Sequence, residues 1–148
     1  MYPIKGKRTR HYAFYDELDI KQLSEDRLME DVFEDALKNG EFQLWYQPKV
    51  DPVTGNILGA EALIRWKRPD GTMLSPGKFI PLFEKNGNIT TLDEYVFRTV
   101  CAQQQRWLQA GAKLYPISVN ISRVSLYYSN VVDKYWELLN SFQLDPKY

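Results

Sequence analysis

The sequence predicts an α/β fold in which a mostly parallel sheet begins with one antiparallel pair of strands. The first observation is an alternation of strand-like and helical patterns from residue 41 onward, at the spacing of βα units. The second is a short turn at residues 51–55, which separates the first two strand patterns and favours a hairpin. A closed βα barrel usually takes ~250 residues, so the chain has roughly half the length of one.

The composition is that of a globular domain that carries no special surface charge. Of the 148 residues, 44% are hydrophobic, which is enough to bury a core. The 19 basic residues balance the 19 acidic ones, which argues against a surface for a nucleic-acid duplex. Cys101 is the single cysteine, so an intramolecular disulfide is excluded. With no membrane-spanning apolar run and no secretory signal, we expect a cytoplasmic protein.

Residues 18–40 are predicted to form a helix, after an aromatic, strand-like run at residues 11–15. Ser24 is a suitable N-cap, apolar residues recur at every fourth position from Met29, and Gly40 ends the pattern. Acidic residues fill the opposite helical face, which we interpret as a solvated surface.

Two strands follow, and together they form the predicted hairpin. Apolar and polar residues alternate from Phe42 to Gln47, and Pro48 and the turn at residues 51–55 are expected to close this strand. The second strand pattern covers residues 57–67 and ends at a turn over residues 68–71.

Two helices are predicted after that turn. The shorter one opens at Ser75-Pro76 and ends near Gly87. The longer one is expected to begin with a capping box formed by Thr91 and Glu94 and to end at Gly111.

The second strand carries the most informative candidate residues. Period-2 geometry places Glu61, Leu63 and Arg65 on one face and residues 62, 64 and 66 on the other. If the first face lines a pocket, the carboxylate is able to bind a hard cation and the guanidinium to bind a phosphate. The alternative interpretation, which alternation alone favours, is an ion pair between neighbours on a half-exposed strand.

A second candidate lies in the last predicted strand, residues 117–121, which precedes a helix capped by Asn130. Asn120 is out of phase with the apolar residues of that strand and lies near its carboxyl end, where α/β barrels place their sites. Its amide oxygen suits Mg²⁺ or Ca²⁺. An Asn that makes a turn hydrogen bond before the helix is the alternative, and the sequence leaves both open.

Other chemistries find little support in the sequence. The single His11 and the single Cys101 exclude a His/Cys metal set and leave no Cys–His pair near a predicted site. The glycines lack the spacing of a phosphate-binding loop. Trp45 and Trp66 are interpreted as packing residues, although a nucleobase would stack on either of them.

Four segments together resemble the EAL domain family. In chain order they are FQLWYQPKVD (residues 42–51), EALIRW (61–66), SPGKFIPLFE (75–84) and VNIS (119–122). Their order and spacing are similar to the family's motifs.

The resemblance implies an α/β fold, an incomplete TIM-like (β/α) barrel whose first strand pair is antiparallel. It also implies a Mg²⁺- or Mn²⁺-dependent phosphodiesterase that hydrolyses cyclic di-GMP to pGpG in bacterial signalling. In that family pattern Glu61 and Asn120 correspond to metal ligands. Gln47, Leu63 and Arg65 correspond to residues that contact cyclic di-GMP, with Arg65 on a phosphate.

The resemblance also implies a division of the chain. Residues 1–17 are similar to the C-terminal tail of a GGDEF domain, residues 18–40 would be an interdomain helix, and residues 41–148 correspond to the N-terminal half of an EAL domain. The family's later acidic motifs and its lysine lie beyond Tyr148. No general base is therefore visible, no catalytic residue is assigned, and we expect the 148 residues alone not to hydrolyse cyclic di-GMP.

Two non-catalytic interpretations stand beside this one. A partial EAL fold would serve as a regulatory module that binds cyclic di-GMP or a partner protein without chemistry. Alternatively, the helix at residues 18–40 would pair with a second copy or with another EAL or GGDEF chain, in which case Phe33→Asp should abolish dimerisation.

Overall fold

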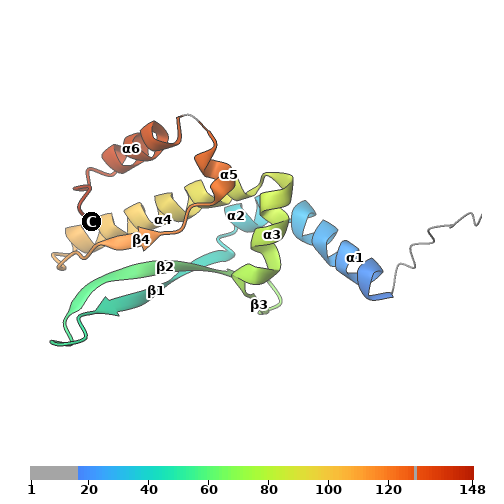
Figure 1. The fold of residues 1–148 in the computed structure, drawn as a ribbon, viewed down its shortest axis with the longest axis horizontal. Helices are drawn as coiled ribbons and strands as arrows, with labels where there is room; N and C mark the ends of the chain where they lie inside the picture. The colour runs from blue at the N-terminus through green and yellow to red at the C-terminus, as the bar shows by residue number, and fades with distance from the viewer. Residues whose placement is uncertain (1–16, 129) are drawn as a thin grey trace, which may run out of the picture.

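A computed structural model describes residues 17–128 and 130–148 (Figure 1). The run predicted at residues 11–15 therefore lies outside the described residues. The elements, in chain order, are α1 (Glu17–Asp31), α2 (Phe33–Lys38), β1 (Phe42–Val50), β2 (Ile57–Lys67), β3 (Met73–Leu74), α3 (Pro76–Asn86), α4 (Ile89–Gln109), β4 (Ile117–Val119), α5 (Arg123–Leu126) and α6 (Val131–Ser141).

The four-stranded sheet is built around β2. β1 pairs with it antiparallel, from Phe42 opposite Trp66 to Val50 opposite Ile57, which confirms the predicted hairpin. β4 pairs parallel with β2 at Ala60–Ala62, and the short β3 pairs antiparallel with the last two residues of β2. The sheet is thus mixed, with the antiparallel pair first, as predicted.

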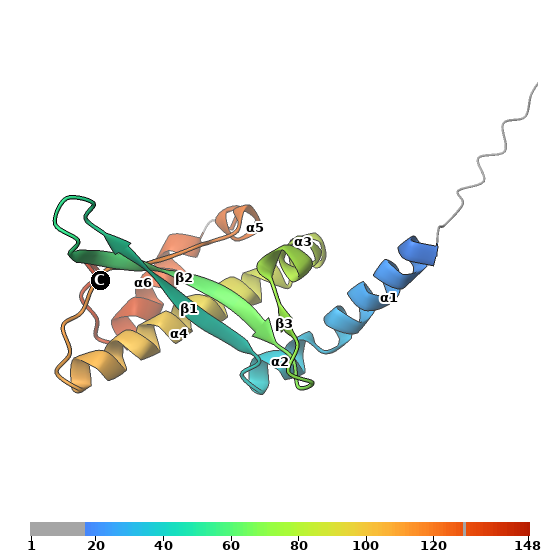
Figure 2. The same cartoon turned by 90° about the horizontal axis from the view of Figure 1, so that it is seen from below.

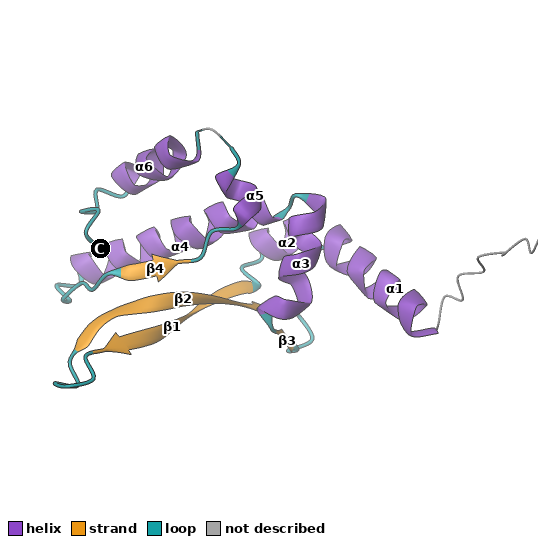
Figure 3. Ribbon diagram, viewed as in Figure 1, coloured by secondary structure: helices purple, strands orange, loops and turns teal. Residues whose placement is uncertain are grey.

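Helices cover one face of this sheet. α4 lies along the sheet and α6 packs on the side of α4 that faces away from it (Figure 3). Tyr95 of α4 donates a hydrogen bond from its hydroxyl to the carbonyl of Phe42 (3.0 Å), and the Trp107 ring of the same helix packs against the Tyr46 ring. The even-numbered residues of β1 and β2 therefore face the core, and the odd-numbered ones face away from the helices.

The main core joins the open end of the hairpin to the helices. Phe42 packs against Trp66 with ring centroids 4.8 Å apart, and the Trp66 indole donates to the Glu41 carboxylate (2.9 Å). The buried members of this cluster are Met29, Phe33, Ala36, Phe42, Trp66, Phe79, Leu82, Phe83, Ile89 and Leu92. A smaller cluster around Cys101, Leu114 and Leu144 lies between α4 and the last residues of the chain.

The N-terminal helical segment differs from its prediction in two respects. It is divided into two helices at Val32, a turn residue that still donates to the Leu28 carbonyl (3.3 Å) and accepts from the Ala36 N–H (2.8 Å). Ser24 lies in the middle of α1 rather than at its start, where its exposed side chain is tolerated. Phe33 is 1% exposed, so it belongs to the core, and Phe33→Asp is unsuitable as a test of dimerisation.

The predicted capping box of the long helix is also wrong. Gly87 ends α3 with a φ of 87° and turns the chain directly into α4, which begins at Ile89. Thr91 and Glu94 therefore lie inside the helix. Glu94 forms ion pairs with Arg98, at 3.0 Å, and with a lysine of α6.

Two further differences concern the strands and a short helix. β1 continues past Pro48 and ends at Val50, immediately before the predicted turn at residues 51–55. Pro48 lies opposite Ala60 in an edge strand, where a missing N–H is tolerated. The short helix α5 was not predicted; it begins after Ser122, whose hydroxyl accepts a hydrogen bond from the Ser125 N–H (3.1 Å). No helix in the described part of the chain is long and apolar enough to cross a membrane.

Candidate functional site

The sheet face that points away from the helices carries four of the five predicted site residues: Gln47, Glu61, Leu63 and Arg65. The fifth, Asn120, directly follows β4. In the strand register, Gln47 of β1 lies opposite Glu61 of β2, and Glu61 lies opposite Ser118 of β4. Leu63 and Arg65 continue the same face of β2 toward its carboxyl end. Figure 2 shows this sheet from below, with α4 behind it.

Glu61 and Asn120 are brought into direct contact. The Asn120 side-chain amide donates a hydrogen bond to the Glu61 carboxylate (2.8 Å), although the two residues are 59 positions apart in the chain. Asn120 therefore forms a tertiary contact across strands rather than the turn hydrogen bond of the alternative interpretation. Glu61 forms no ion pair with Arg65 within the described residues, so the alternative of an ion pair between neighbours on this strand does not apply either.

The backbone that follows Asn120 is held by a buried carboxylate. Asp93 of α4, which is 7% exposed, accepts hydrogen bonds from the Ser122 N–H (2.8 Å) and from the Ser125 hydroxyl (2.7 Å). Ser122 in turn caps α5. The loop that carries Asn120 is thereby tied to α4 on one side and to Glu61 on the other.

Cationic groups lie at both ends of the face. Lys49 of β1 donates from its ammonium group to the Ser118 hydroxyl (2.7 Å), beside the Glu61 row. Arg65 donates one N–H to the Ile64 carbonyl (2.8 Å), and its other donors make no hydrogen bond or ion pair within the described residues. The Arg65 guanidinium lies 5.9 Å from the centroid of the Trp45 ring. Two cations and one carboxylate make this face suited to an anionic ligand.

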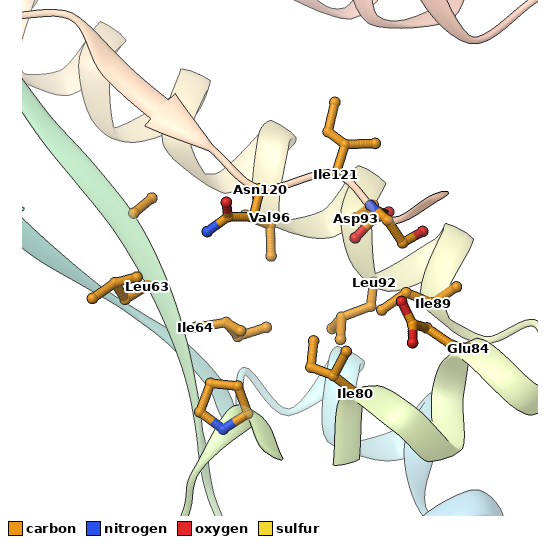
Figure 4. A pocket seen from close by; sticks show the side chains of 13 residues that line it. Leu63, Ile64, Ile80, Glu84, Ile89, Leu92, Asp93, Val96, Asn120 and Ile121 are labelled. Atoms are coloured by element: carbon orange, nitrogen blue, oxygen red, sulfur yellow. Dashed lines mark hydrogen bonds between the residues drawn. The ribbon is translucent and has the colours of Figure 1, made fainter. Parts of the chain in front are cut away.

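A cavity of about 350 Å³ opens where β4 ends and β2 continues. Its walls are mainly apolar; in Figure 4, Ile64 of β2 and Ile80 of α3 point toward one another across it. Leu63, Asn120 and Asp93 also line it. The predicted ligand residue Leu63 thus lies between the exposed strand face and this cavity.

The chemistry of the Glu61–Asn120 pair fits a hard divalent cation in part. Carboxylate and amide oxygens are the donors that Mg²⁺ prefers, and half a turn of the Asn120 amide would present its oxygen beside the carboxylate. Two protein ligands are fewer than a dedicated site requires. No group of three or more His, Cys, Asp or Glu side chains gathers elsewhere in the described residues either.

Several residues of this region were not found from the sequence. Lys49 and Ser118 have no distinctive local pattern, and Asp93 occurs in a helical stretch where an acidic residue is ordinarily solvated. Their positions depend on the parallel pairing of β4 with β2, which local alternation does not specify.

The comparisons with known proteins agree with one another. A family model described as "EAL domain" matches residues 30–147. The bifunctional diguanylate cyclase/cyclic di-GMP phosphodiesterase MucR of Pseudomonas aeruginosa is 32% identical over 149 residues, which cover 100% of this chain and 22% of MucR. The cyclic di-GMP phosphodiesterase NbdA of the same organism is 31% identical over 134 residues, which cover 90% of this chain and 17% of NbdA. The chain thus spans about a fifth of the length of these relatives.

A solved structure, the PaMucR phosphodiesterase in complex with c-di-GMP, gives the same result in three dimensions. Its TM-score is 0.74 at 34% identity, and the similarity covers 80% of this chain and 48% of that one. This likeness confirms the predicted fold class, an α/β, TIM-like barrel of which the described elements form an incomplete part.

Proposed function

This chain belongs to the EAL domain family, and from that membership we propose that it forms part of the site of a cyclic di-GMP phosphodiesterase. The observation that carries the proposal is the convergence of Glu61 and Asn120, at 2.8 Å, on a strand face that also presents Gln47, Leu63 and Arg65. The names of MucR and NbdA, and the c-di-GMP complex of PaMucR, support the choice of ligand.

The proposed binding roles follow from the chemistry of each side chain. Cyclic di-GMP carries two phosphate charges, and the free donors of Arg65 would bind one phosphate as a fork. The exposed Gln47 amide, opposite Glu61, would hydrogen-bond to the ligand. Leu63 would provide apolar contact beside the cavity.

Glu61 and Asn120 would hold Mg²⁺ or Mn²⁺ through their side-chain oxygens. A bound divalent cation supplies activation of water and stabilisation of charge on the phosphate oxygens. The residues of this chain contribute position: β2 fixes Glu61, and the Asp93-anchored loop fixes Asn120.

Binding is the direct test. Calorimetric titration with cyclic di-GMP and Mg²⁺ should show saturable binding, and Arg65→Ala should weaken it about tenfold, because a hydrogen bond to a charged group is lost. Arg27→Ala, an exposed arginine on α1, is the matched control and should change nothing. Absence of binding to the wild-type chain would refute the proposal.

A non-catalytic binding module is the second candidate. It is favoured by the donor set of the site, in which Glu61 is the single carboxylate paired with Asn120, and no cluster of three such ligands occurs within the described residues. We expect the purified 148 residues to bind cyclic di-GMP without turnover. Chromatographic detection of pGpG with Mg²⁺ or Mn²⁺ present would contradict this expectation.

We further propose that residues 1–17 are the tail of a GGDEF domain and that residues 18–40 connect it to an EAL domain that begins near residue 41. The alignment with MucR, a protein named as both cyclase and phosphodiesterase, covers the whole chain and supports this division. Deletion of residues 1–17 should leave the thermal midpoint of the remaining chain unchanged. A large decrease would place those residues in the EAL fold.

Self-association through α1 is proposed as well. α1 extends away from the rest of the molecule (Figures 1 and 2), and it exposes Ile20, Leu23 and Leu28. A second copy of α1 would cover these apolar side chains. Sedimentation equilibrium should then show a dimer that Leu23→Lys dissociates, whereas a wild-type monomer at all concentrations would rule this out.

A further inference from the structure

The two tryptophans of the hairpin occupy opposite environments. Trp66 is 0% exposed, and its indole N–H is satisfied by Glu41. Trp45 is 55% exposed and belongs to neither hydrophobic cluster. The structure thus assigns packing to Trp66 and leaves the large aromatic surface of Trp45 without a comparable role in the core.

The surroundings of Trp45 are those of the proposed ligand face. Trp45 lies directly opposite Leu63 in the strand register, and Gln47, two residues along β1, lies opposite Glu61. The Arg65 guanidinium lies 5.9 Å from the centre of the Trp45 ring, within the range of a cation–π contact. The indole therefore adjoins three of the residues proposed to contact the nucleotide.

We propose that Trp45 is the platform on which a guanine base of the cyclic dinucleotide stacks, while Arg65 binds the adjacent phosphate. This inference rests on the proposed function. An exposed indole offers a flat apolar face to any purine, and the neighbouring guanidinium neutralises the phosphate that a stacked nucleotide carries with it. Because every base has a π-face, Trp45 adds affinity without selecting guanine over adenine.

The position of Trp45 makes the inference testable without damage to the fold. Since Trp45 packs in neither core cluster, we expect Trp45→Ala to leave the fold intact. Its urea midpoint should stay close to that of the wild-type chain. Trp136 on α6, which is 54% exposed, offers the matched control at a position away from the hairpin.

The experiment is a titration of the 148-residue chain with cyclic di-GMP, followed by calorimetry and by the indole N–H signals in NMR spectra. We expect Trp45→Ala to weaken binding roughly tenfold or more, the range of one base–aromatic stack. Trp45→Phe should retain most of the affinity, because the benzyl ring still stacks. Trp136→Ala should bind as the wild-type chain does. The Trp45 indole signal, identified by its loss in Trp45→Phe, should shift on ligand addition.

The outcomes separate this inference from the function on which it rests. If the wild-type chain binds and Trp45→Ala binds equally well, the stacking role is refuted and the proposed function stands. If Trp45→Ala loses affinity and Trp45→Phe does not recover it, the role is not stacking, and the inference fails again. If the wild-type chain does not bind, both fail.

Discussion

At the scale of single residues, Asp93 supports the loop that carries Asn120, and it also lines the cavity beside the site. Its carboxylate accepts hydrogen bonds from the Ser122 N–H and the Ser125 hydroxyl, two donors that would otherwise lose this acceptor inside the fold. We expect Asp93→Ala to lower the free energy of unfolding by about 2–3 kcal/mol, because a buried donor without a partner costs about 1–3 kcal/mol. Urea denaturation measures the change.

Asp133→Ala, on the exposed surface of α6, is the control for Asp93 and should stay within about 0.5 kcal/mol of the wild-type chain. Asp93→Asn keeps one acceptor oxygen and should fall between the two. Equal stability of Asp93→Ala and the wild-type chain would mean that the loop after Asn120 does not depend on this carboxylate.

The residues of the site could be predicted one at a time but not as a set. Strand alternation correctly placed Glu61, Leu63 and Arg65 on one face, and it singled out Asn120. Their distance could not be predicted, since the Glu61–Asn120 hydrogen bond spans 59 positions and depends on which strand β4 joins. For the same reason the sequence could not decide which of the two hairpin tryptophans is buried.

At the scale of elements, the closest approach between β2 and the segment that enters β4 occurs at Gly59. A Cβ atom there would lie 2.6 Å from the Pro116 carbonyl oxygen, which also accepts the Ala60 N–H (2.9 Å). We expect Gly59→Ala to lower the free energy of unfolding by about 1–3 kcal/mol, as overpacking does. Thermal unfolding measures the change.

Gly77→Ala is the control substitution. A Cβ atom at Gly77, in the first turn of α3, meets nothing within 4 Å, and alanine favours the helix. This variant should be at least as stable as the wild-type chain. If Gly59→Ala is equally well tolerated, β4 has room to move away from β2.

The contact between α4 and α6 is expected to depend on pH. The hydrogen bond from Lys134 and the nearby Arg98 hold the pKa of Glu94 below its ordinary value of 4.5. A carboxylate with a lowered pKa stabilises the fold above the ordinary value, and that contribution is lost as pH falls through the lowered one. The stability difference between wild type and Glu94→Gln should therefore be up to about 1 kcal/mol at pH 7 and shrink as the pH falls below 4.5. A difference that stays constant over that pH range would contradict this.

Helix starts were predicted correctly at Ser75 and Asn130 but not at Ser24 or Thr91. The limits of β2 and the hairpin follow from alternation and turn residues, which act locally. Ser24 and the Thr91–Glu94 pair have the residue types of caps, but caps work only where the helix actually begins. For α4 that point is set by Gly87, which ends α3 with a positive φ directly before Ile89.

At the scale of the whole molecule, the segment before the hairpin is part of the core. Phe33 packs edge-to-face against Phe83 with ring centroids 4.7 Å apart and is 1% exposed. We expect Phe33→Ala to lower the free energy of unfolding by about 3–5 kcal/mol. Glu34→Ala, at an exposed position beside Phe33 in α2, should change it by less than about 0.5 kcal/mol. Equal effects in urea denaturation would show that this segment does not contribute to the core.

The overall architecture could be predicted further than the packing. The order of strand and helix patterns and the four motifs led to the correct fold class. The separation into a main core and a second cluster around Cys101 could not be predicted, because residues from distant parts of the chain fill both clusters.

The mixed pairing of β2 has a consequence for the order of folding. Its antiparallel partner, β1, is joined to it by a turn of a few residues, and such hairpins close within microseconds. Its parallel partner arrives only after α3 and α4, so a long loop must close first, and this step is intrinsically slower. We therefore expect Gln47, Glu61, Leu63 and Arg65 to be aligned early in folding and Asn120 to join them in the last step. The face formed by the hairpin would thus exist before the Glu61–Asn120 hydrogen bond closes.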